Sequence, residues 1–367
     1  MTASSVVPTV TRSTDPAVPL GRRTGGRPWA GPVVMAAILV GLLAVGPGSL
    51  MNVAITAFTF AIAAQGLTVL AGPVGVVSIG SSAFVGAGAF VTAYFVKTAA
   101  LDLLPAMILG ILVCGVLGLA AAPIAGKLSG IQIAIITVGL SFLAQYVFQV
   151  ATPFTGGGAG LQLDAITVAG HDLNAPLRLA GVIVPVDSVF LTLTTMILLL
   201  TTVATTNLLK SRTGRALYMT GTSAIGARTF GIDPARYRAI AFIYAAVLGG
   251  LAGGLLASRQ GFISWEQFGI AMSINLIAVI VLGGLGSVYG AIAGAVVVYA
   301  LPEVVKIYAD VLPFVSISSS GLTPERATAI LYGLLLVVIT VLEPAGLAGV
   351  HQRLARRARR LIGRAKT

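Results

Sequence analysis

The side chains that could carry out chemistry are few in this 367-residue chain, and they are scattered along it. His171 and His351 stand alone, so no cluster has the spacing of a metal site. The single cysteine, Cys114, lies inside an apolar run, and no Ser, His and Asp occur in an order that supports nucleophilic catalysis. The segment 126–128 (GKL) lacks the glycine spacing and the hydroxyl residue of a phosphate-binding loop. We therefore expect the chain itself to have no enzymatic activity and to hold no metal and no cofactor.

Charged groups are missing from the centres of the apolar segments, where ion-coupled transporters usually carry protons on a carboxylate. Glu303 and Lys306 lie near the end of one segment, where we expect a snorkelling or paired structural role. Polar residues inside the segments are expected to form interhelical hydrogen bonds or to face a pore. They are Asn52, Gln65, Ser78, Ser81, Ser82, Gln132, Thr137, Ser141, Gln145, Gln149, Ser273 and Asn275.

The elements that must position these residues are apolar helices. Hydrophobic residues make up 57% of the chain and charged residues only 9%, whereas about a quarter of a soluble chain is charged. Repeated apolar runs of about 20 residues predict an all-α, polytopic helical membrane protein. Its 45 glycines would let helices pack closely in lipid. About ten segments are predicted, near 31–50, 52–71, 77–97, 102–126, 131–151, 188–209, 238–258, 270–284, 287–306 and 326–343. The eighth is short for a full crossing and glycines separate it from the ninth, so broken or re-entrant helices are expected there.

Charge predicts the orientation of these segments. The tails at 1–28 and 346–367, Lys127 and the segment 209–238 hold 18 of the 23 Lys and Arg residues. Positive charge stays in the cytoplasm, so an even number of crossings with both termini cytoplasmic is self-consistent. Residues 1–28 lack the apolar core of a signal peptide, so we expect a disordered basic tail there. A transmembrane domain is predicted at 29–345, and its segment 152–187 is predicted to be an extracytoplasmic loop. The basic run 353–366 fits anionic headgroups better than nucleic acid.

Two glycine-interrupted segments, 66–90 and 273–296, occupy comparable places in what we predict to be two pseudo-related halves. Each runs from an apolar helix through a glycine-rich break into a helix of small residues. Paired interruptions of this kind point to a translocation pathway, because broken backbone at membrane depth lines a cavity or is buried in protein. Tight helix packing without substrate contact is the alternative. The residues assigned to the pathway are Gly72, Gly75, Ser78, Gly80, Ser82, Phe84, Gly86, Ser273, Asn275, Gly283, Gly284 and Gly286.

The basic, glycine-punctuated segment 209–238 lies between two apolar segments. Residues 216–230 can form a short helix that is interrupted by Gly221 and Gly226 and ends after Gly231. A protein that only anchors itself needs no such segment, so a docking helix for a cytoplasmic partner is one interpretation. An ordinary cytoplasmic loop, basic because of its orientation, is the other.

Collinear motifs over about residues 50–350 resemble the permeases of branched-chain amino-acid ABC importers, and their order is closest to the M-type subunit. The motifs in the first half are Gly66-Leu67-x-x-Leu70-x-Gly72, Ser78-x-Gly80, Ala83-Phe84-x-Gly86-x-Gly88-Ala89 and Thr155-Gly156-Gly157. Those in the second half are Ser211-Arg212-x-Gly214-Arg215-Ala216, Ala224 to Gly231-Ile232, Gly249-x-x-Ala252-Gly253, Val281-Leu282-Gly283-Gly284-Leu285-Gly286-Ser287, Leu301-Pro302-Glu303 and Glu343-Pro344-x-Gly346-Leu347.

This resemblance implies a permease subunit in a bacterial cytoplasmic membrane, working with a second homologous permease, two cytoplasmic ATPases that bind the ATP, and an extracytoplasmic solute-binding protein. It implies ATPase contact within 210–237, at Arg215, Ala216, Ala224, Gly226, Ala227, Arg228 and Gly231. Members of the family usually carry acidic residues before the alanines there, and this chain has none in 220–227 (TGTSAIGA).

Two questions stay open at this point. The substrate implied by the family is leucine, isoleucine or valine, but urea and short amides are transported by relatives, and nothing in the helices separates them. An ion-coupled secondary transporter and a membrane-bound enzyme acting on lipid are the alternatives in function. The first would favour a buried carboxylate and the second a cluster of His, Asp or Glu at the interface, and neither is found in the sequence.

Overall fold

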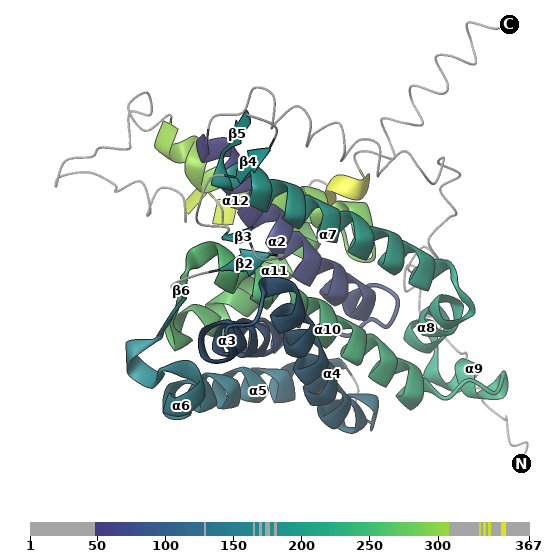
Figure 1. Cartoon of the computed structure of the whole chain (residues 1–367). Helices are drawn as coiled ribbons and strands as arrows, with labels where there is room; N and C mark the ends of the chain where they lie inside the picture. Colours follow the sequence, from purple (N-terminus) through teal and green to yellow (C-terminus); the bar gives the residue numbers. More distant parts are fainter. Residues whose placement is uncertain are drawn as a thin grey trace, which may run out of the picture.

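The computed structural model describes residues 48–127, 130–163, 166–168, 171–172, 177–179 and 182–307, with short pieces at 330–331, 333–334, 337–338 and 346–349. Long helices dominate this part of the chain, which confirms the all-α, polytopic class (Figure 1). The helices are α2 (Gly48–Ala71), α3 (Ser81–Ala99), α4 (Leu103–Lys127), α5 (Gly130–Val150), α6 (Thr152–Thr155), α7 (Val186–Lys210), α8 (Arg212–Thr222), α9 (Ala224–Thr229), α10 (Pro234–Gln260), α11 (Ile270–Gly283) and α12 (Val288–Ile307).

Six described helices, α2, α3, α4, α5, α7 and α10, are long and apolar enough to cross a membrane. Helices α11 and α12 qualify only together, and they are bent by 119° at the break between them. The eighth and ninth predicted segments are therefore one broken span or a re-entrant loop, and the described residues give six or seven spans. The predicted total of ten is not confirmed, since the segments near 31–50 and 326–343 lie largely outside the described residues.

Helices α2 and α10 form the centre of the bundle. The most apolar window of α2 is 89% buried, whereas that of α5 is only 22% buried. Helix α10 packs against α4, α3 and α2, and α2 also packs against α12 and α7 (Figure 1). Large apolar side chains on α4 and α5, such as Leu112 and Phe142, are exposed on the outside of the bundle. Lipid is as apolar as they are, so this exposure has little cost in a membrane.

Small residues allow the closest approach, between α3 and α10. A Cβ atom added to Gly88 would lie 2.2 Å from the carbonyl oxygen of Gly250. One added to Gly253 would lie 1.9 Å from the carbonyl oxygen of Val85. Only glycine is compatible with such backbone contact, so close packing is the role of these three glycines.

The two ends of the bundle are distinguished by their connections. Between α5 and α7 the chain forms 3₁₀ turn η1 (Gly157–Ala159) and strands β1 (Leu161–Gln162), β2 (Thr167–Val168), β3 (His171–Asp172), β4 (Leu177–Leu179) and β5 (Val182–Val184). Strand β1 pairs antiparallel with β6 (Phe262–Ile263), which follows α10 and precedes 3₁₀ turn η2 (Trp265–Phe268). The loop after α5 and the C-terminal end of α10 therefore meet at one end, the β1–β6 end. Helices α8 and α9 precede α10 and lie at the other, the α8–α9 end (Figure 1).

Candidate functional site

The two predicted interruptions lie against each other. Break 1 is the segment 72–80 between α2 and α3, and break 2 is the segment 284–287 between α11 and α12. A Cβ atom added to Gly72 would lie 2.3 Å from the Cα atom of Gly286. Gly284 and Gly286 have φ angles of 107° and 82°, which strain any residue with a side chain. Backbone contact therefore requires glycine on both sides of this junction.

Break 1 and the first turn of α3 lie along much of the length of α11. Gly72 lies beside break 2 at the C-terminal end of α11, while the backbone N–H of Ser82 donates to Ser273 Oγ at 2.9 Å near its N-terminal end. The helical turns from Ser273 to Gly283 rise about 15 Å. Non-helical backbone over such a distance inside a membrane must have its polar groups bonded within the protein.

Hydroxyl groups of α5 supply part of this bonding. The backbone N–H of Ile79 donates to Thr137 Oγ1 at 3.0 Å, and Ser141 Oγ donates to the carbonyl oxygen of Ile79 at 2.9 Å. The backbone N–H of Gly80 donates to Ser78 Oγ at 3.3 Å. Thr137 and Ser141 are not among the predicted pathway residues, although their spacing of four residues places them on one helix face.

A cluster of three serines joins the first turn of α3, directly after break 1, to α11 and α5. Ser273 Oγ donates to Ser82 Oγ at 2.8 Å, and Ser82 Oγ lies 3.4 Å from Ser141 Oγ. Ser82 and Ser273 are fully buried. The residue before α3, Gly80, offers no side chain to cap the helix, so Ser273 performs this task from a neighbouring helix. This geometry supports the interhelical hydrogen-bonding interpretation for Ser82 and Ser273.

Replacing Ser273 with alanine is expected to destabilise the folded chain by about 1–3 kcal/mol, because the buried Ser82 loses both of its hydrogen bonds with Ser273. Thermal unfolding of the detergent-purified chain measures this loss. Asn275→Ala on the exposed face of α11 serves as the matched control and should change stability little. Equal unfolding temperatures for Ser273→Ala and the unchanged chain would contradict the role given to Ser273.

Two other predicted pathway residues are open to the surroundings. No atom lies within 4 Å of the position that a Cβ atom of Gly75 would take, and its φ is 70°. Asn275 is exposed, although Ser273, two residues earlier on α11, is buried. An exposed amide on an apolar helix faces away from the packed core, so α11 presents one polar group to each side.

The remaining predicted pathway residues are packing residues in this structure. Phe84 is buried, and a Cβ atom added to Gly86 would lie 2.5 Å from the ring of Phe148. At the bend between α11 and α12, a Cβ atom added to Gly283 would lie 2.1 Å from the carbonyl oxygen of Gly290. The structure therefore brings only some of the predicted pathway residues together, and these lie around the junction of the two breaks.

The segment 210–237 forms two helices, α8 and α9, instead of the single helix predicted over 216–230. The chain breaks at Ser223 and not at Gly221 or Gly226, because Ser223 Oγ accepts a hydrogen bond from the backbone N–H of Gly226 at 3.0 Å and so caps α9. Ser211 caps α8 in the same way, which starts that helix earlier than predicted.

One face of α8 and α9 is packed against the bundle and the other is exposed. Leu217, Ala216 and Ala227 are buried, so two of the three predicted docking alanines pack against the bundle. Ile225 and Phe230 are 77% and 76% exposed, which is unusual for large apolar side chains outside the spans. Ile225 lies in α9 and Phe230 at its C-terminal cap, and the two side chains are called the Ile225–Phe230 surface below.

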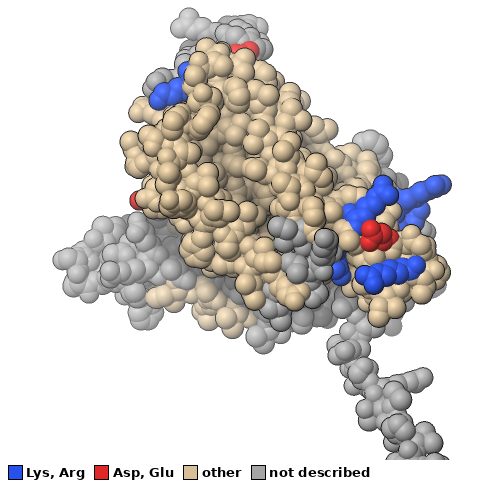
Figure 2. Space-filling model, turned by 90° about the horizontal axis from the view of Figure 1, so that it is seen from below, with Lys and Arg blue, Asp and Glu red and all other residues tan. Residues whose placement is uncertain are grey.

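Basic side chains surround the α8–α9 end, as Figure 2 shows on the side where α8 and α9 lie. The segment from Lys210 to Arg238 has six Lys and Arg residues and one acidic residue, Asp233. Of the predicted docking residues, Arg215, Arg228 and Gly231 are exposed, and Ala224 and Gly226 are half-buried. Partial burial raises the pKa of the Tyr218 phenol above its ordinary value of 10.0, so this group stays neutral.

The α8–α9 end touches break 1 directly. A Cβ atom added to Gly221, near the end of α8, would lie 2.1 Å from the carbonyl oxygen of Pro73 and 3.0 Å from the carbonyl carbon of Val74. A continuous path of backbone contacts thus leads from α8 through break 1 to Gly286 in break 2. A displacement of α8 must be accommodated by break 1, because packed backbone does not compress.

The sequence profile of the family described as branched-chain amino acid transport system / permease component matches residues 49–340. The chain belongs to this family. The matched residues include both breaks, α8 and α9, so the junction of Gly72 and Gly286 lies within the region that this chain shares with the family.

Individual relatives of this permease are similar over long or short stretches. The high-affinity branched-chain amino acid transport system permease protein LivM of Salmonella typhimurium is 29% identical over 269 residues, 70% of this chain and 63% of that protein. LivM of Escherichia coli K12 is 29% identical over 276 residues, with the same coverage. The autoinducer 2 import system permease protein LsrC of Photorhabdus laumondii is 40% identical over 94 residues, 24% of this chain and 28% of that protein.

This chain thus spans less than two thirds of the length of the LivM proteins that it matches. No solved structure matches it. Among the described residues of the permease, no three His, Cys, Asp or Glu side chains come together in a group that could hold a metal ion.

Proposed function

We propose that this chain is a transmembrane permease subunit of an ATP-binding-cassette importer that carries branched-chain amino acids or a similar small polar solute. Family membership and the similarity to LivM support a transport role. Its partners in this proposal are a second homologous permease, two cytoplasmic ATPases that bind and hydrolyse ATP, and an extracytoplasmic solute-binding protein. The complex lies in the bacterial cytoplasmic membrane, and the chain has no enzymatic activity and no cofactor of its own.

The observation that carries the proposal is the contact of Gly221 in α8 with Pro73 in break 1. Through it, a movement imposed on α8 and α9 reaches the junction of Gly72 and Gly286. ATP-driven closure of the ATPases pushes on the α8–α9 end and changes the arrangement of the two breaks. Such a switch needs an element with two alternative packings, and non-helical segments are easier to repack than helices.

The orientation of the chain in the membrane follows from the proposed contact of the α8–α9 end with the ATPases. The α8–α9 end, with its excess of basic residues, faces the cytoplasm, as positive charge in short loops requires. The β1–β6 end then faces the solute-binding protein. Both termini are cytoplasmic in this arrangement, and the C-terminal basic run 353–366 lies next to anionic headgroups rather than nucleic acid.

The contact with the ATPase uses apolar anchors in place of the missing carboxylates. Ile225 and Phe230 are the exposed apolar groups of the segment, and Arg215 and Arg228 lie on the exposed faces of the same helices. Large apolar side chains surrounded by charged residues are typical of protein interfaces. In this proposal the second permease packs on the side of α11 that exposes Asn275. The pathway then runs between the two subunits, beside the breaks.

An ion-coupled transporter acting alone gains no support from the buried groups at the junction. Among the described residues, the buried polar side chains at break 1 are the hydroxyls of Ser78, Ser82, Thr137, Ser141 and Ser273. None of them changes charge in the physiological pH range, so none can exchange a proton with an ion gradient.

Reconstitution of the complete complex in proteoliposomes tests the proposed function. Uptake of labelled leucine should require the ATPases and internal ATP and should persist when ionophores collapse the ion gradients. Orthovanadate should stop it, because it traps the ATPase partners. Concentrative uptake by the chain alone, or uptake that ends with the ion gradient, would overturn the proposal.

A further inference from the structure

The short described piece 346–349 packs on break 2. A Cβ atom added to Gly346 would lie 2.5 Å from the backbone nitrogen of Gly284, 2.7 Å from its Cα atom and 2.8 Å from the carbonyl oxygen of Leu282. Gly346 is buried and has a φ of 65°, a conformation that favours glycine. The contact is therefore made by backbone on both sides.

Break 2 is thus held between two segments that are distant in the sequence. Gly72 of break 1 lies against Gly286, and Gly346 lies against Gly284. In the proposed function the two breaks change their arrangement. Break 2 cannot do so while both neighbours stay in place, because packed backbone does not compress. Any force that fixes Gly346 therefore opposes this change.

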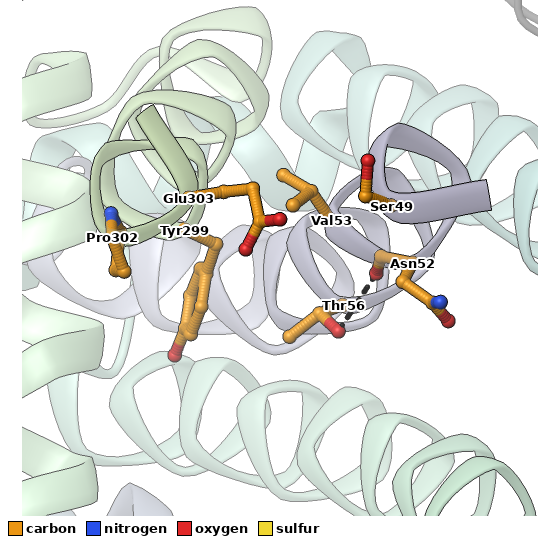
Figure 3. Close-up of a pocket in the computed structure, with 7 residues that line it drawn as sticks. All are labelled: Ser49, Asn52, Val53, Thr56, Tyr299, Pro302 and Glu303. Atoms are coloured by element: carbon orange, nitrogen blue, oxygen red, sulfur yellow. Dashed lines mark hydrogen bonds between the residues drawn. The ribbon is translucent and has the colours of Figure 1, made fainter. Parts of the chain in front are cut away.

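The helices on either side of break 2 are anchored, so movement must concentrate in the break itself. Helix α11 is bonded to the start of α3 through Ser273. Helix α12 packs along α2, where the ring of Tyr299 stacks on Phe60 with 4.4 Å between ring centroids. Farther from break 2, Glu303 of α12 and Val53 of α2 line one cavity of about 370 Å³ (Figure 3). The two helices therefore stay side by side at the far end of α12.

The basic run 353–366 begins a few residues after this piece, and its sequence has the pattern of an amphipathic helix. It lies outside the described residues. At the helical spacing of about 100° per residue, its six apolar residues fall within an arc of about 120°, and its seven Lys and Arg residues fall outside that arc. The apolar residues are Leu354, Ala355, Ala358, Leu361, Ile362 and Ala365, and the basic ones are Arg353, Arg356, Arg357, Arg359, Arg360, Arg364 and Lys366. No acidic residue occurs in 345–367, so the pattern is that of a segment that lies on an anionic membrane surface.

We propose that the run 353–366 binds the anionic surface of the membrane, and that this binding holds Gly346 on break 2 and slows transport. Arg353 follows Gly349 by four residues, a span of at most about 14 Å, so the run cannot settle on the membrane without restraining the piece 346–349. The attraction between the run and the lipid grows with the fraction of anionic headgroups. The charge of the membrane surface therefore sets how firmly break 2 is held.

This inference rests on the proposed transport function and adds a control to it. Gly72 of break 1 is followed by Pro73, which Gly221 of α8 contacts, so break 2 and Gly346 lie toward the α8–α9 end. In the proposed orientation this end faces the cytoplasm, where the membrane leaflet carries anionic lipid. The ATPases then drive the two breaks from α8, while the run restrains them through Gly346.

Uptake by the complete complex in proteoliposomes of two lipid compositions tests this restraint. ATP-driven uptake of labelled leucine should be severalfold faster in phosphatidylcholine vesicles than in vesicles that also contain phosphatidylglycerol. Replacing the seven basic residues of the run with glutamine should give the faster rate in both lipids. Equal or slower uptake by the unchanged chain in phosphatidylcholine, or the same lipid dependence in the seven-glutamine variant, would overturn the proposal.

The other basic tail provides the matched control. It carries four arginines, Arg12, Arg22, Arg23 and Arg27. Replacing these four with glutamine should preserve the difference in uptake between the two lipids, because the segment 1–28 is not connected to the piece 346–349. Loss of the difference in this control as well would show that basic tails act through overall charge, which would also contradict the role of Gly346.

A linker variant tests whether the run acts through Gly346. A flexible Gly-Ser linker of about 16 residues between Gly349 and Val350 spans about 20 Å on average, so the run can bind the membrane without fixing the piece 346–349. Uptake by this variant should be fast in both lipids. The same linker placed after Thr367 should leave the lipid dependence unchanged. Full lipid dependence with the linker after Gly349 would refute the connection to break 2.

Binding of the run to lipid can be measured without transport. The native cysteine, Cys114, is buried, so Thr367→Cys can carry an environment-sensitive fluorophore in the full chain. Its emission should shift to the blue in nanodiscs that contain phosphatidylglycerol and not in phosphatidylcholine alone, and a short RNA should leave it unchanged. A shift caused by the RNA in place of the lipid would make the run a nucleic-acid site and overturn the proposal.

The two proposals fail separately. ATP-driven uptake that is equal in both lipids would refute the restraint and leave the importer intact. Uptake that needs no ATPase, together with lipid-dependent emission and lipid-dependent rates, would refute the importer and leave the restraint.

Discussion

Replacing Gly72 with valine is expected to abolish uptake and to destabilise the folded chain. A Cβ atom at this position would meet the Cα atom of Gly286 at 2.3 Å and its nitrogen at 2.7 Å, and neither is a flexible side-chain end that can move aside. Overpacking of a well-packed site costs about 1–3 kcal/mol even when side chains can adjust, so the cost here should reach the upper part of that range or exceed it. Uptake by the reconstituted complex and thermal unfolding of the purified chain measure the two effects.

Gly139→Val in α5 is the matched control for this experiment. The position has open space where the Cβ atom would go, and valine has a slightly higher helix propensity than glycine, so no loss of stability is expected there. Normal uptake and stability for Gly72→Val would show that the two breaks do not touch in the working transporter. A loss of both properties in Gly139→Val as well would show that valine harms any glycine position in the membrane.

The existence of the two breaks could be predicted from the sequence, but their contact could not. Glycine runs reveal where a helix ends, since glycine weakens helices and permits positive φ. Gly72 and Gly286 are far apart in the sequence, and no local pattern states that one lies against the other. The same limit applies to Thr137 and Ser141, whose polarity is visible in the sequence while their partner, the backbone of Ile79, is not.

Hydropathy also predicts how long a membrane span is better than it predicts whether the span is bent or which of its faces is buried. The glycines between the apolar segments 270–284 and 287–306 predict a broken or re-entrant helix, which the bent pair confirms, but composition does not give the angle of 119° between the two parts. Burial within one helix is equally hard to predict. Ser273 and Asn275 were assigned together to the pathway, yet one is buried in a hydrogen-bonded cluster and the other is exposed, because the two positions differ by about 200° around a helix.

Removing the apolar anchors of the Ile225–Phe230 surface is expected to release the ATPase partner. The double replacement Ile225→Ala and Phe230→Ala removes two side chains that are 77% and 76% exposed in the isolated chain. Interface anchors contribute about 2 kcal/mol or more each, so the loss of both, about 4 kcal/mol, should lower ATPase affinity by about 700-fold. Co-purification with the ATPase and titration of the complex in detergent measure the loss.

Membrane insertion and the unfolding temperature should not change in this double variant, because neither side chain packs in the bundle. Leu200→Ala on α7 is the matched control, since this leucine is 70% exposed but lies within a predicted span. It should leave ATPase affinity intact, because a side chain that faces lipid has no access to a cytoplasmic partner. Full retention of the ATPase by the double variant would move the docking surface to another part of the chain. The ATPase would then not push on α8, and the contact of Gly221 with Pro73 would no longer transmit its movement to break 1.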